Sequence, residues 1–178
     1  MDIFLDSYKL RKPKLDDADG FIEICSEKET MRYYGTEGSL IKTKTEAIEQ
    51  INWCNSLFDN NGGRWIITEI EKDEYIGDIG FHNFQQNHNK AEIGFRIKQS
   101  YQRKGIMTKC IKELIRYGFQ TLNYNRIEAQ VDSRNEGSKK VLLTNNFTCE
   151  GLLREYEYEY NNYIDINIYS ILRKEFIA

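Results

Sequence analysis

Residues 101–108 read Tyr-Gln-Arg-Lys-Gly-Ile-Met-Thr, and they join a short strand to an amphipathic helix. The segment before them, Glu-Ile-Gly-Phe-Arg-Ile at 92–97, alternates apolar with other residues, which predicts a strand with one apolar face. Apolar residues between 107 and 118 recur at helical spacing and predict a helix. Two cations, a glycine and the free N–H groups of a helix start therefore meet at one turn. This combination suits a pyrophosphate, because exposed amides and the positive end of the helix dipole both attract anions.

The turn differs from two well-known phosphate loops. The chain contains neither G-x-x-x-x-G-K-[ST] nor G-x-G-x-x-G. Residues 102–107, Gln-Arg-Lys-Gly-Ile-Met, instead resemble the Q/R-x-x-G-x-G/A signature of the GNAT acetyltransferases. Met107 stands where that family usually has glycine or alanine, so we expect its side chain to turn into the helix–sheet core. A solvated basic turn without a ligand is the alternative that this stretch alone leaves open.

Further segments in the same order extend the resemblance to nearly the whole chain, from Leu10 to Arg173. They are Asn-Arg-Ile-Glu-Ala at 125–129, Asn-Glu-Gly-Ser at 135–138, Glu-Gly-Leu-Leu-Arg-Glu at 150–155 and Asp-Ile-Asn-Ile-Tyr at 165–169. The chain is thereby similar to the RimJ/RimL-like branch of N-acetyltransferases, which includes enzymes that act on ribosomal-protein N-termini. The resemblance implies an α+β fold of the GNAT type. Its central twisted, mostly antiparallel sheet is flanked by helices and splays open at the acyl-CoA site.

Length and composition fit one compact enzyme domain over residues 1–178. Hydrophobic residues make up 40% of the chain, and a domain of this length buries about 70% of its unfolded surface. A net charge of −3 argues against a nucleic-acid partner, which usually binds a basic surface. No stretch approaches the roughly 20 apolar residues of a membrane span, and the N-terminus lacks a signal-like pattern. We therefore expect a cytoplasmic protein without membrane contact.

The cysteines and histidines show no metal-ligand spacing. Cys25, Cys54, Cys110 and Cys149 form no C-x-x-C pair, and each lies beside apolar residues. We expect reduced, mostly buried thiols and no metal site.

The order of predicted elements is that of a mixed sheet with helices. Strands are expected at about 7–13, 64–71, 75–84, 92–97 and 126–132, followed by a hairpin of 148–160 with 163–173. Helices are expected after Asp16 or Asp17, either of which can cap the first one, and then over 43–58, 107–118 and 137–145. The expected apolar stripe of the first helix is Ala18, Phe21, Ile22 and Cys25.

The GNAT resemblance implies which residues hold acetyl-CoA, the cosubstrate. Backbone amides and cations of the turn would bind its diphosphate, and the pantetheine would pair with the splayed strand. A backbone N–H near Arg96 or Ile97 would face the thioester oxygen. Asn135 is expected to cap the helix that it begins and, by family likeness, to touch the pantetheine arm. The residues expected to bind the cosubstrate are therefore Phe95, Arg96, Ile97, Gln102, Arg103, Lys104, Gly105, Ile106, Met107, Thr108 and Asn135.

Proton transfer needs a base for the protonated amine and an acid for the departing thiolate. Ser138 falls on the serine of the branch's N-x-x-S motif and is the expected proton donor, with helix capping as its alternative role. Glu92 is the leading candidate base, with a solvated strand glutamate as the alternative interpretation. Asp78 and Glu69 are weaker candidates. No cysteine has a recognisable nucleophile setting, so we expect direct attack in a ternary complex.

Two segments are candidates for the acceptor side. Residues 31–35, Met-Arg-Tyr-Tyr-Gly, lie between the first two predicted helices, where related enzymes form an acceptor wall. Along 154–160 glutamates and tyrosines alternate. The favoured interpretation is solvated glutamates and tyrosines that cover the core; an acidic row that attracts a cationic amine is the alternative.

Three functions remain open at this point. The favoured one is an acetyl-CoA-dependent N-acetyltransferase that acts on a protein N-terminal α-amine, for example that of a ribosomal protein. A small-molecule N-acetyltransferase for a polyamine, an amino acid or an aminoglycoside is the alternative. A noncatalytic acetyl-CoA-binding module is the third. Both a monomer and a homodimer are compatible with the sequence.

Overall fold

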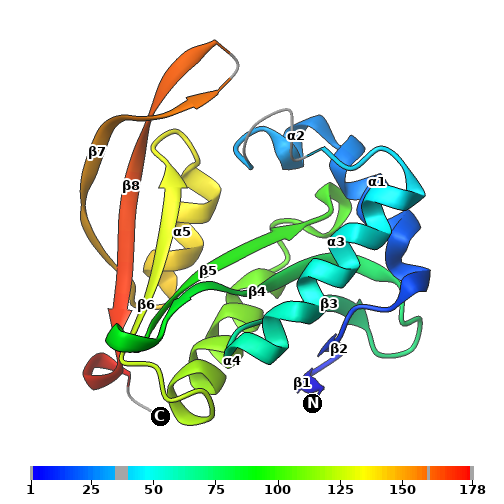
Figure 1. Ribbon diagram of the computed structural model, residues 1–178, viewed down its shortest axis with the longest axis horizontal. Helices are drawn as coiled ribbons and strands as arrows, with labels where there is room; N and C mark the ends of the chain where they lie inside the picture. The colour runs from blue at the N-terminus through cyan, green and yellow to red at the C-terminus, as the bar shows by residue number, and fades with distance from the viewer. Residues whose placement is uncertain (1, 35–39, 160, 177–178) are drawn as a thin grey trace.

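The computed structural model describes residues 2–34, 40–159 and 161–176, in which eight strands form one sheet in the order β1-β2-β3-β4-β5-β6-β8-β7 (Figure 1). Every neighbouring pair is antiparallel except β5 with β6. The mixed, mostly antiparallel sheet expected from the sequence is thus confirmed. The strands are β1 (Ile3–Leu5), β2 (Tyr8–Arg11), β3 (Gly63–Glu69), β4 (Tyr75–Gln85), β5 (Lys90–Ile97), β6 (Arg126–Asp132), β7 (Thr148–Glu159) and β8 (Asn162–Leu172).

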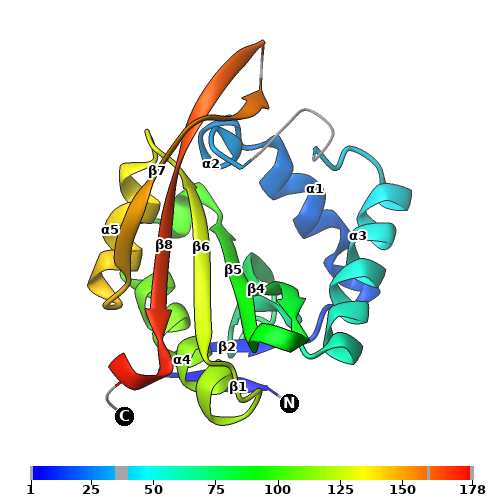
Figure 2. The same cartoon turned by 60° about the vertical axis from the view of Figure 1, so that its left-hand side comes forward.

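Helices cover both faces of the sheet, and each face carries a hydrophobic core (Figures 1 and 2). One core packs beneath α4, where Trp65 and Phe81 of the sheet are buried. The other packs beneath α1 and α3, where Ile66 and Tyr75 face the helices. The described helices are α1 (Ala18–Ser26), α2 (Lys28–Met31), α3 (Lys44–Ser56), α4 (Ile106–Gln120) and α5 (Glu136–Thr144), and none of them is long and apolar enough to cross a membrane.

The helix expected after the basic turn, α4, forms because its apolar positions share one stripe. Each fully buried large aliphatic side chain contributes about 1.5–3 kcal/mol to such packing. The buried residues of this helix are Ile106, Met107, Cys110, Ile111, Leu114, Ile115, Gly118 and Phe119. Helix α3 begins with a capping box, in which the Thr43 hydroxyl accepts from the Glu46 N–H and the Glu46 carboxylate accepts from the Thr43 N–H.

Several local predictions need correction. Strand β1 and the four-residue helix α2 were not predicted, because segments this short carry little periodicity. In α1, Ile24 is buried in place of Ile22, which is only half-buried. Asp17 makes no side-chain cap on α1.

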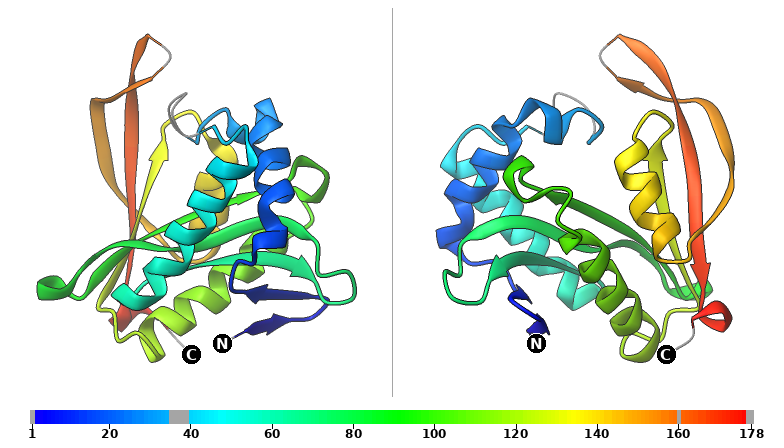
Figure 3. Two further views of the ribbon diagram at one scale, coloured as in Figure 1. Left: turned by 45° about the vertical axis from the view of Figure 1, so that its right-hand side comes forward. Right: turned by 180° about the vertical axis from the view of Figure 1, so that it is seen from behind.

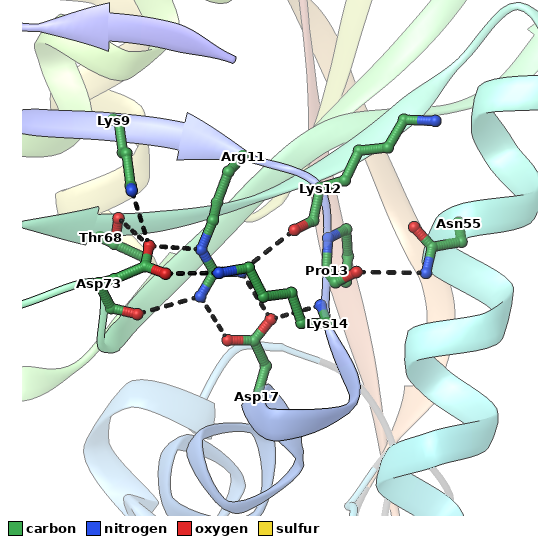
Figure 4. Close-up of polar contacts among 9 residues, drawn as sticks. All are labelled: Lys9, Arg11, Lys12, Pro13, Lys14, Asp17, Asn55, Thr68 and Asp73. Carbon is green, nitrogen blue, oxygen red and sulfur yellow. Dashed lines mark hydrogen bonds and ion pairs between the residues drawn. The ribbon is translucent and has the colours of Figure 1, made fainter. Parts of the chain in front are cut away.

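The Asp17 carboxylate instead belongs to a polar network that fixes the end of β2 (Figure 4). It accepts from Arg11 at 2.7 and 2.8 Å and from the Lys14 N–H at 2.7 Å. Asp73, in the turn between β3 and β4, accepts from Arg11 at 2.7 Å and pairs with Lys9 and Lys14. Partial burial alone would raise the pKa of Asp73, but these three cations outweigh it and hold the pKa well below its usual range. The network therefore connects the end of β2 to the β3–β4 turn, about sixty residues further along the chain.

Candidate active site

The sheet opens between β5 and β6. These strands pair only where Lys90–Glu92 lies beside Arg126–Glu128, and beyond Glu92 they diverge (Figure 3). A cleft of about 1720 Å³ lies at this opening, lined by β5, the first turns of α4 and α5, α3 and the β7–β8 hairpin. The splayed strand implied by the family resemblance is confirmed at the predicted place.

The turn before α4 leaves its backbone N–H groups without partners. Gly105 has φ of 75°, and the chain before it passes through φ of 59° at Arg103. The first backbone bond of the helix runs from the Lys109 N–H to the Gly105 carbonyl. Among the described residues, no hydrogen bond uses the six N–H groups from Arg103 to Thr108. A left-handed glycine therefore aims a row of amide donors at the cleft, where the dipole of a fifteen-residue helix also favours an anion.

Side chains of this turn divide between the core and the surface. Arg103 and Lys104 are exposed, and the Lys104 ammonium lies 5.1 Å from the centre of the Tyr101 ring. Met107 is 7% exposed and packs in the core under the sheet, as its replacement of a small residue required. The amide of Gln102 is engaged, since it donates to the Ile97 carbonyl at 3.2 Å and to Thr30 at 3.1 Å. Its side chain therefore braces the turn against β5.

The first turn of α5 forms the next part of the cleft. Asn135 is its N-cap, since the Asn135 side-chain oxygen accepts from the Ser138 N–H at 3.1 Å, which confirms the predicted capping role. Ser138 takes part in the cap through its backbone N–H and not through its hydroxyl. Its hydroxyl makes no hydrogen bond to any of the described residues and lines the cleft.

Glu92 lines the cleft from β5, with its carboxylate held by two neighbours on β4. Asn83 donates to one oxygen at 3.0 Å, and His82 lies 3.5 Å from the other. Burial alone would raise the pKa of Glu92, but its hydrogen bonds with His82 and Asn83 hold that pKa below its usual value. The carboxylate is therefore ionised at neutral pH.

The two weaker candidate bases are wrong. Asp78 is wholly buried and accepts from Arg64 at 2.6 Å and from Arg96 at 2.7 Å. Burial alone would raise its pKa, but both guanidinium groups lower it; the Tyr75 hydroxyl also donates to this carboxylate, and Asp78 is not among the described residues that line the cleft. Glu69 pairs with Lys72 beside the β3–β4 turn and does not line the cleft.

The alternating segment of β7 faces the opposite way from the favoured interpretation. Tyr156 and Tyr158 are exposed, whereas Glu159 is buried and Glu157 is half-buried at the cleft. The pairing of β7 with β8 is interrupted in this segment by a register shift between Leu153 and Glu157, where Glu155 has φ of 51°. Tyr160 and Gly35, which belong to the candidate acceptor segments, lie outside the described residues.

Burial comes first in raising the pKa values of Glu157 and Glu159, and repulsion from neighbouring carboxylates adds to it. Among the described residues, neither carboxylate has a hydrogen bond or an ion pair. The positive charge of Arg134 partly offsets the negative charge of Glu159 and lowers its pKa, and the remaining negative charge lines the hairpin side of the cleft.

On the α1 side of the cleft, the sequence predicted Tyr34 within the candidate acceptor segment 31–35 but did not predict Arg64. Arg64 and Tyr34 line the cleft, and the Arg64 side chain donates to the Tyr34 hydroxyl. Arg96 was expected only for its backbone, yet its guanidinium also joins this cluster. The available signal that a long side chain crosses the sheet here was a glycine in each of two neighbouring predicted strands, Gly80 and Gly94, which are directly paired in the structure.

The thiols agree with the expected reduced state. The four cysteines are free, and Cys25, Cys54 and Cys110 are buried while Cys149 is exposed. Within residues 2–34, 40–159 and 161–176, no group of three or more His, Cys, Asp or Glu side chains could hold a metal ion.

Comparison with known proteins agrees with this geometry. A family model described as an acetyltransferase (GNAT) domain matches residues 8–148. The uncharacterized N-acetyltransferase YoaA of Bacillus subtilis (strain 168) is 37% identical over 165 residues, covering 92% of this chain and 92% of that protein.

Two solved structures share the fold. RimL, a ribosomal L7/L12 alpha-N-protein acetyltransferase in complex with coenzyme A, has a TM-score of 0.88 at 18% identity and covers 99% of this chain and 100% of that one. A spermidine N-acetyltransferase from Vibrio cholerae in complex with CoA and spermine has a TM-score of 0.83 at 23% identity, covering 96% of this chain and 98% of that one. Since the family model spans most of the chain and a relative of similar length is 37% identical, the chain belongs to the GNAT acetyltransferase family and is an N-acetyltransferase.

Proposed function

We propose that the protein transfers the acetyl group of acetyl-CoA to a primary amine by direct attack in a ternary complex. The observation that carries this proposal is the row of six backbone N–H groups from Arg103 to Thr108, which have no partner in the described part of the chain and lie next to an opened strand. A diphosphate would accept from these amides, and Arg103 and Lys104 would add positive charge at its edge.

The edge of β5 suits an extended pantetheine arm. Ile93 to Ile97 have no pairing with β6, so this edge is open along Phe95 and Arg96. Phe95 and Ile97 also line the cleft. An arm lying there would add hydrogen bonds as a further strand would. A backbone N–H near Arg96 or Ile97 would then donate to the thioester oxygen as negative charge develops.

The chain offers one group for each proton transfer. Glu92 would take a proton from the ammonium, directly or through water, so that the free amine can attack. The new N–C bond forms as the C–S bond breaks, and Ser138 would donate a proton to the departing sulfur. Burial raises the pKa of the Cys54 thiol to about 11 and that of the Cys110 thiol to about 12, which argues against a cysteine nucleophile.

The acceptor would approach from the side of Glu157 and Glu159. Their negative charge attracts an ammonium group and supports an amine acceptor. We favour a protein N-terminal α-amine, with a small-molecule amine as the alternative.

The test combines calorimetry with steady-state kinetics. Coenzyme A should bind the purified protein, and the double substitution Arg103→Ala with Lys104→Ala should raise the acetyl-CoA KM about tenfold without a similar change for the acceptor. Lys112→Ala is the matched control, because Lys112 is exposed further along the same helix and does not line the cleft. Absence of any affinity for coenzyme A would refute the proposal.

A further inference from the structure

Arg64 lies across the sheet rather than pointing away from it. Arg64, Gly80 and Gly94 occupy directly paired positions on β3, β4 and β5. A Cβ on Gly80 would lie 2.5 Å from the Arg64 Cα, and one on Gly94 would lie 3.2 Å from the Arg64 Nη1. The two glycines therefore leave a channel in which the guanidinium reaches the splayed strand.

One end of this guanidinium is fully engaged, and the other is open. Nε donates to Asp78 at 2.6 Å, and Nη2 donates to the Tyr34 hydroxyl. Nη1 has no acceptor among the described residues, although the side chain is only 4% exposed. Three polar side-chain atoms of the described residues have neither solvent contact nor a hydrogen-bond partner, and Nη1 is not one of them. Nη1 is therefore in contact with solvent in the cleft that Arg64 lines.

The cluster around Arg64 holds more positive than negative charge. Among the described residues, Arg64 and Arg96 form ion pairs with one carboxylate, that of Asp78, which lies between them. Burial raises the pKa values of Tyr34 and Tyr75, so neither hydroxyl supplies an anion at neutral pH. A buried cation without a counter-charge is costly, and an oxygen entering from the cleft would offset that cost.

We propose that Arg64 Nη1 binds an oxygen atom that the acceptor carries next to its amine. This inference rests on the proposed function, because the amine must reach the thioester beside β5, and Gly94 belongs to that segment. An α-amino acid offers a carboxylate at this position, and the N-terminal residue of a peptide offers its first carbonyl. A polyamine offers only donors and positive charge there. The acceptor class is therefore an α-amino acid or a peptide N-terminus.

The wild-type enzyme gives the first test, with coenzyme A release as the readout. For each of the twenty side chains, three acceptors are compared: the free amino acid, a pentapeptide that begins with it and the decarboxylated amine; spermidine is assayed beside them. We expect the best oxygen-bearing acceptor to exceed its decarboxylated partner in kcat/KM by about 10- to 100-fold, as one charge-assisted hydrogen bond produces. Preference for the amino acid identifies a carboxylate, and preference for the peptide identifies a carbonyl.

Equal or better turnover of decarboxylated amines or spermidine overturns the inference while leaving the proposed function intact. Failure of every oxygen-bearing acceptor despite coenzyme A binding also overturns it. Absence of coenzyme A binding would instead remove the proposed function.

Arg64→Lys is the second test, since it keeps the positive charge but lacks Nη1. In this variant the kcat/KM of an oxygen-bearing acceptor should exceed that of its decarboxylated partner by no more than about threefold. The acetyl-CoA KM should stay the same. Arg116→Lys, an exposed position on α4 that pairs with Glu113, is the matched control and should keep the wild-type ratio. An undiminished ratio in folded Arg64→Lys refutes the assignment. If Arg64→Lys does not fold, the kcat/KM ratio between an oxygen-bearing acceptor and its decarboxylated partner in the wild-type enzyme decides whether the inference holds.

Discussion

Asp78→Asn should destabilise the protein strongly, because it removes the one carboxylate between two buried guanidinium groups. Asp78 is 0% exposed and pairs with Arg64 at 2.5 Å and with Arg96 at 2.7 Å. The asparagine keeps the shape but not the charge, so two cations would face each other in the core. Breaking a buried pair costs about 3–5 kcal/mol, and we expect about 3 kcal/mol because the cleft lets water reach Arg64. This is a large part of a typical free energy of unfolding of 5–15 kcal/mol.

Urea denaturation followed by circular dichroism measures this loss, and thermal melting should show a decrease of about 6–12 °C in Tm. Asp19→Asn is the matched control: Asp19 pairs with Lys44 at 3.3 Å, but both side chains are more than 70% exposed. We expect no measurable change there, because exposed pairs contribute little. A loss below about 1 kcal/mol for Asp78→Asn would show that the cluster does not need its carboxylate.

Wild type and Asp78→Asn can also be compared by the pH dependence of their stability, because the pKa shift of Asp78 fixes the direction of the change. The pKa of Asp78 is lower in the folded protein than its unfolded value of about 3.9. A lowered pKa means that the carboxylate contributes its stability above the unfolded pKa and loses it as the pH falls through the folded pKa. The difference between wild type and Asp78→Asn should therefore be constant near neutral pH and shrink below about pH 4. A difference that instead grew on acidification would contradict the charge argument.

The remaining predictions concern catalysis and the thiols. Ser138→Ala should lower kcat about 100-fold with little change in Tm, since the N–H rather than the hydroxyl makes the cap; wild-type turnover would leave Ser138 only a place in the helix. Glu92→Gln should lower kcat/KM and flatten its acidic limb, which lies at or below the ordinary glutamate pKa of about 4.3 because the folded pKa is lowered; superposable profiles would exclude Glu92 as the base. In the native protein, Cys149 should react quickly with a thiol reagent, whereas buried Cys54 and Cys110, with raised pKa values, should react only after unfolding; fast labelling of more than one thiol would contradict this burial.

Local pattern was sufficient for the cosubstrate side of the site. The turn at 101–108, helix α4 and the first turn of α5 lie next to one another along short stretches of chain, and their geometry follows from glycine, helix periodicity and capping. The burial of Met107 also follows locally, because a long side chain at that position has only the core available. The roles of Ser138 and Glu92 in the reaction stay predictions, to be decided by kinetics.

The acceptor side required the tertiary structure. Arg64, Asp78 and Arg96 come from three strands, and only the register of β3, β4 and β5 brings them into contact. On β7, beyond register shifts at Cys149/Gly151 and Leu153/Glu157, Glu157 and Glu159 line the cleft, whereas Tyr156 and Tyr158 are more than half exposed. The sequence by itself determined the GNAT architecture and the turn with its row of amide donors, since both depend on periodicity and on a helix terminus. Strand register and bulges decided which charges meet in the cleft, because side chains alternate across a strand and a shift of one residue reverses the face that each one occupies.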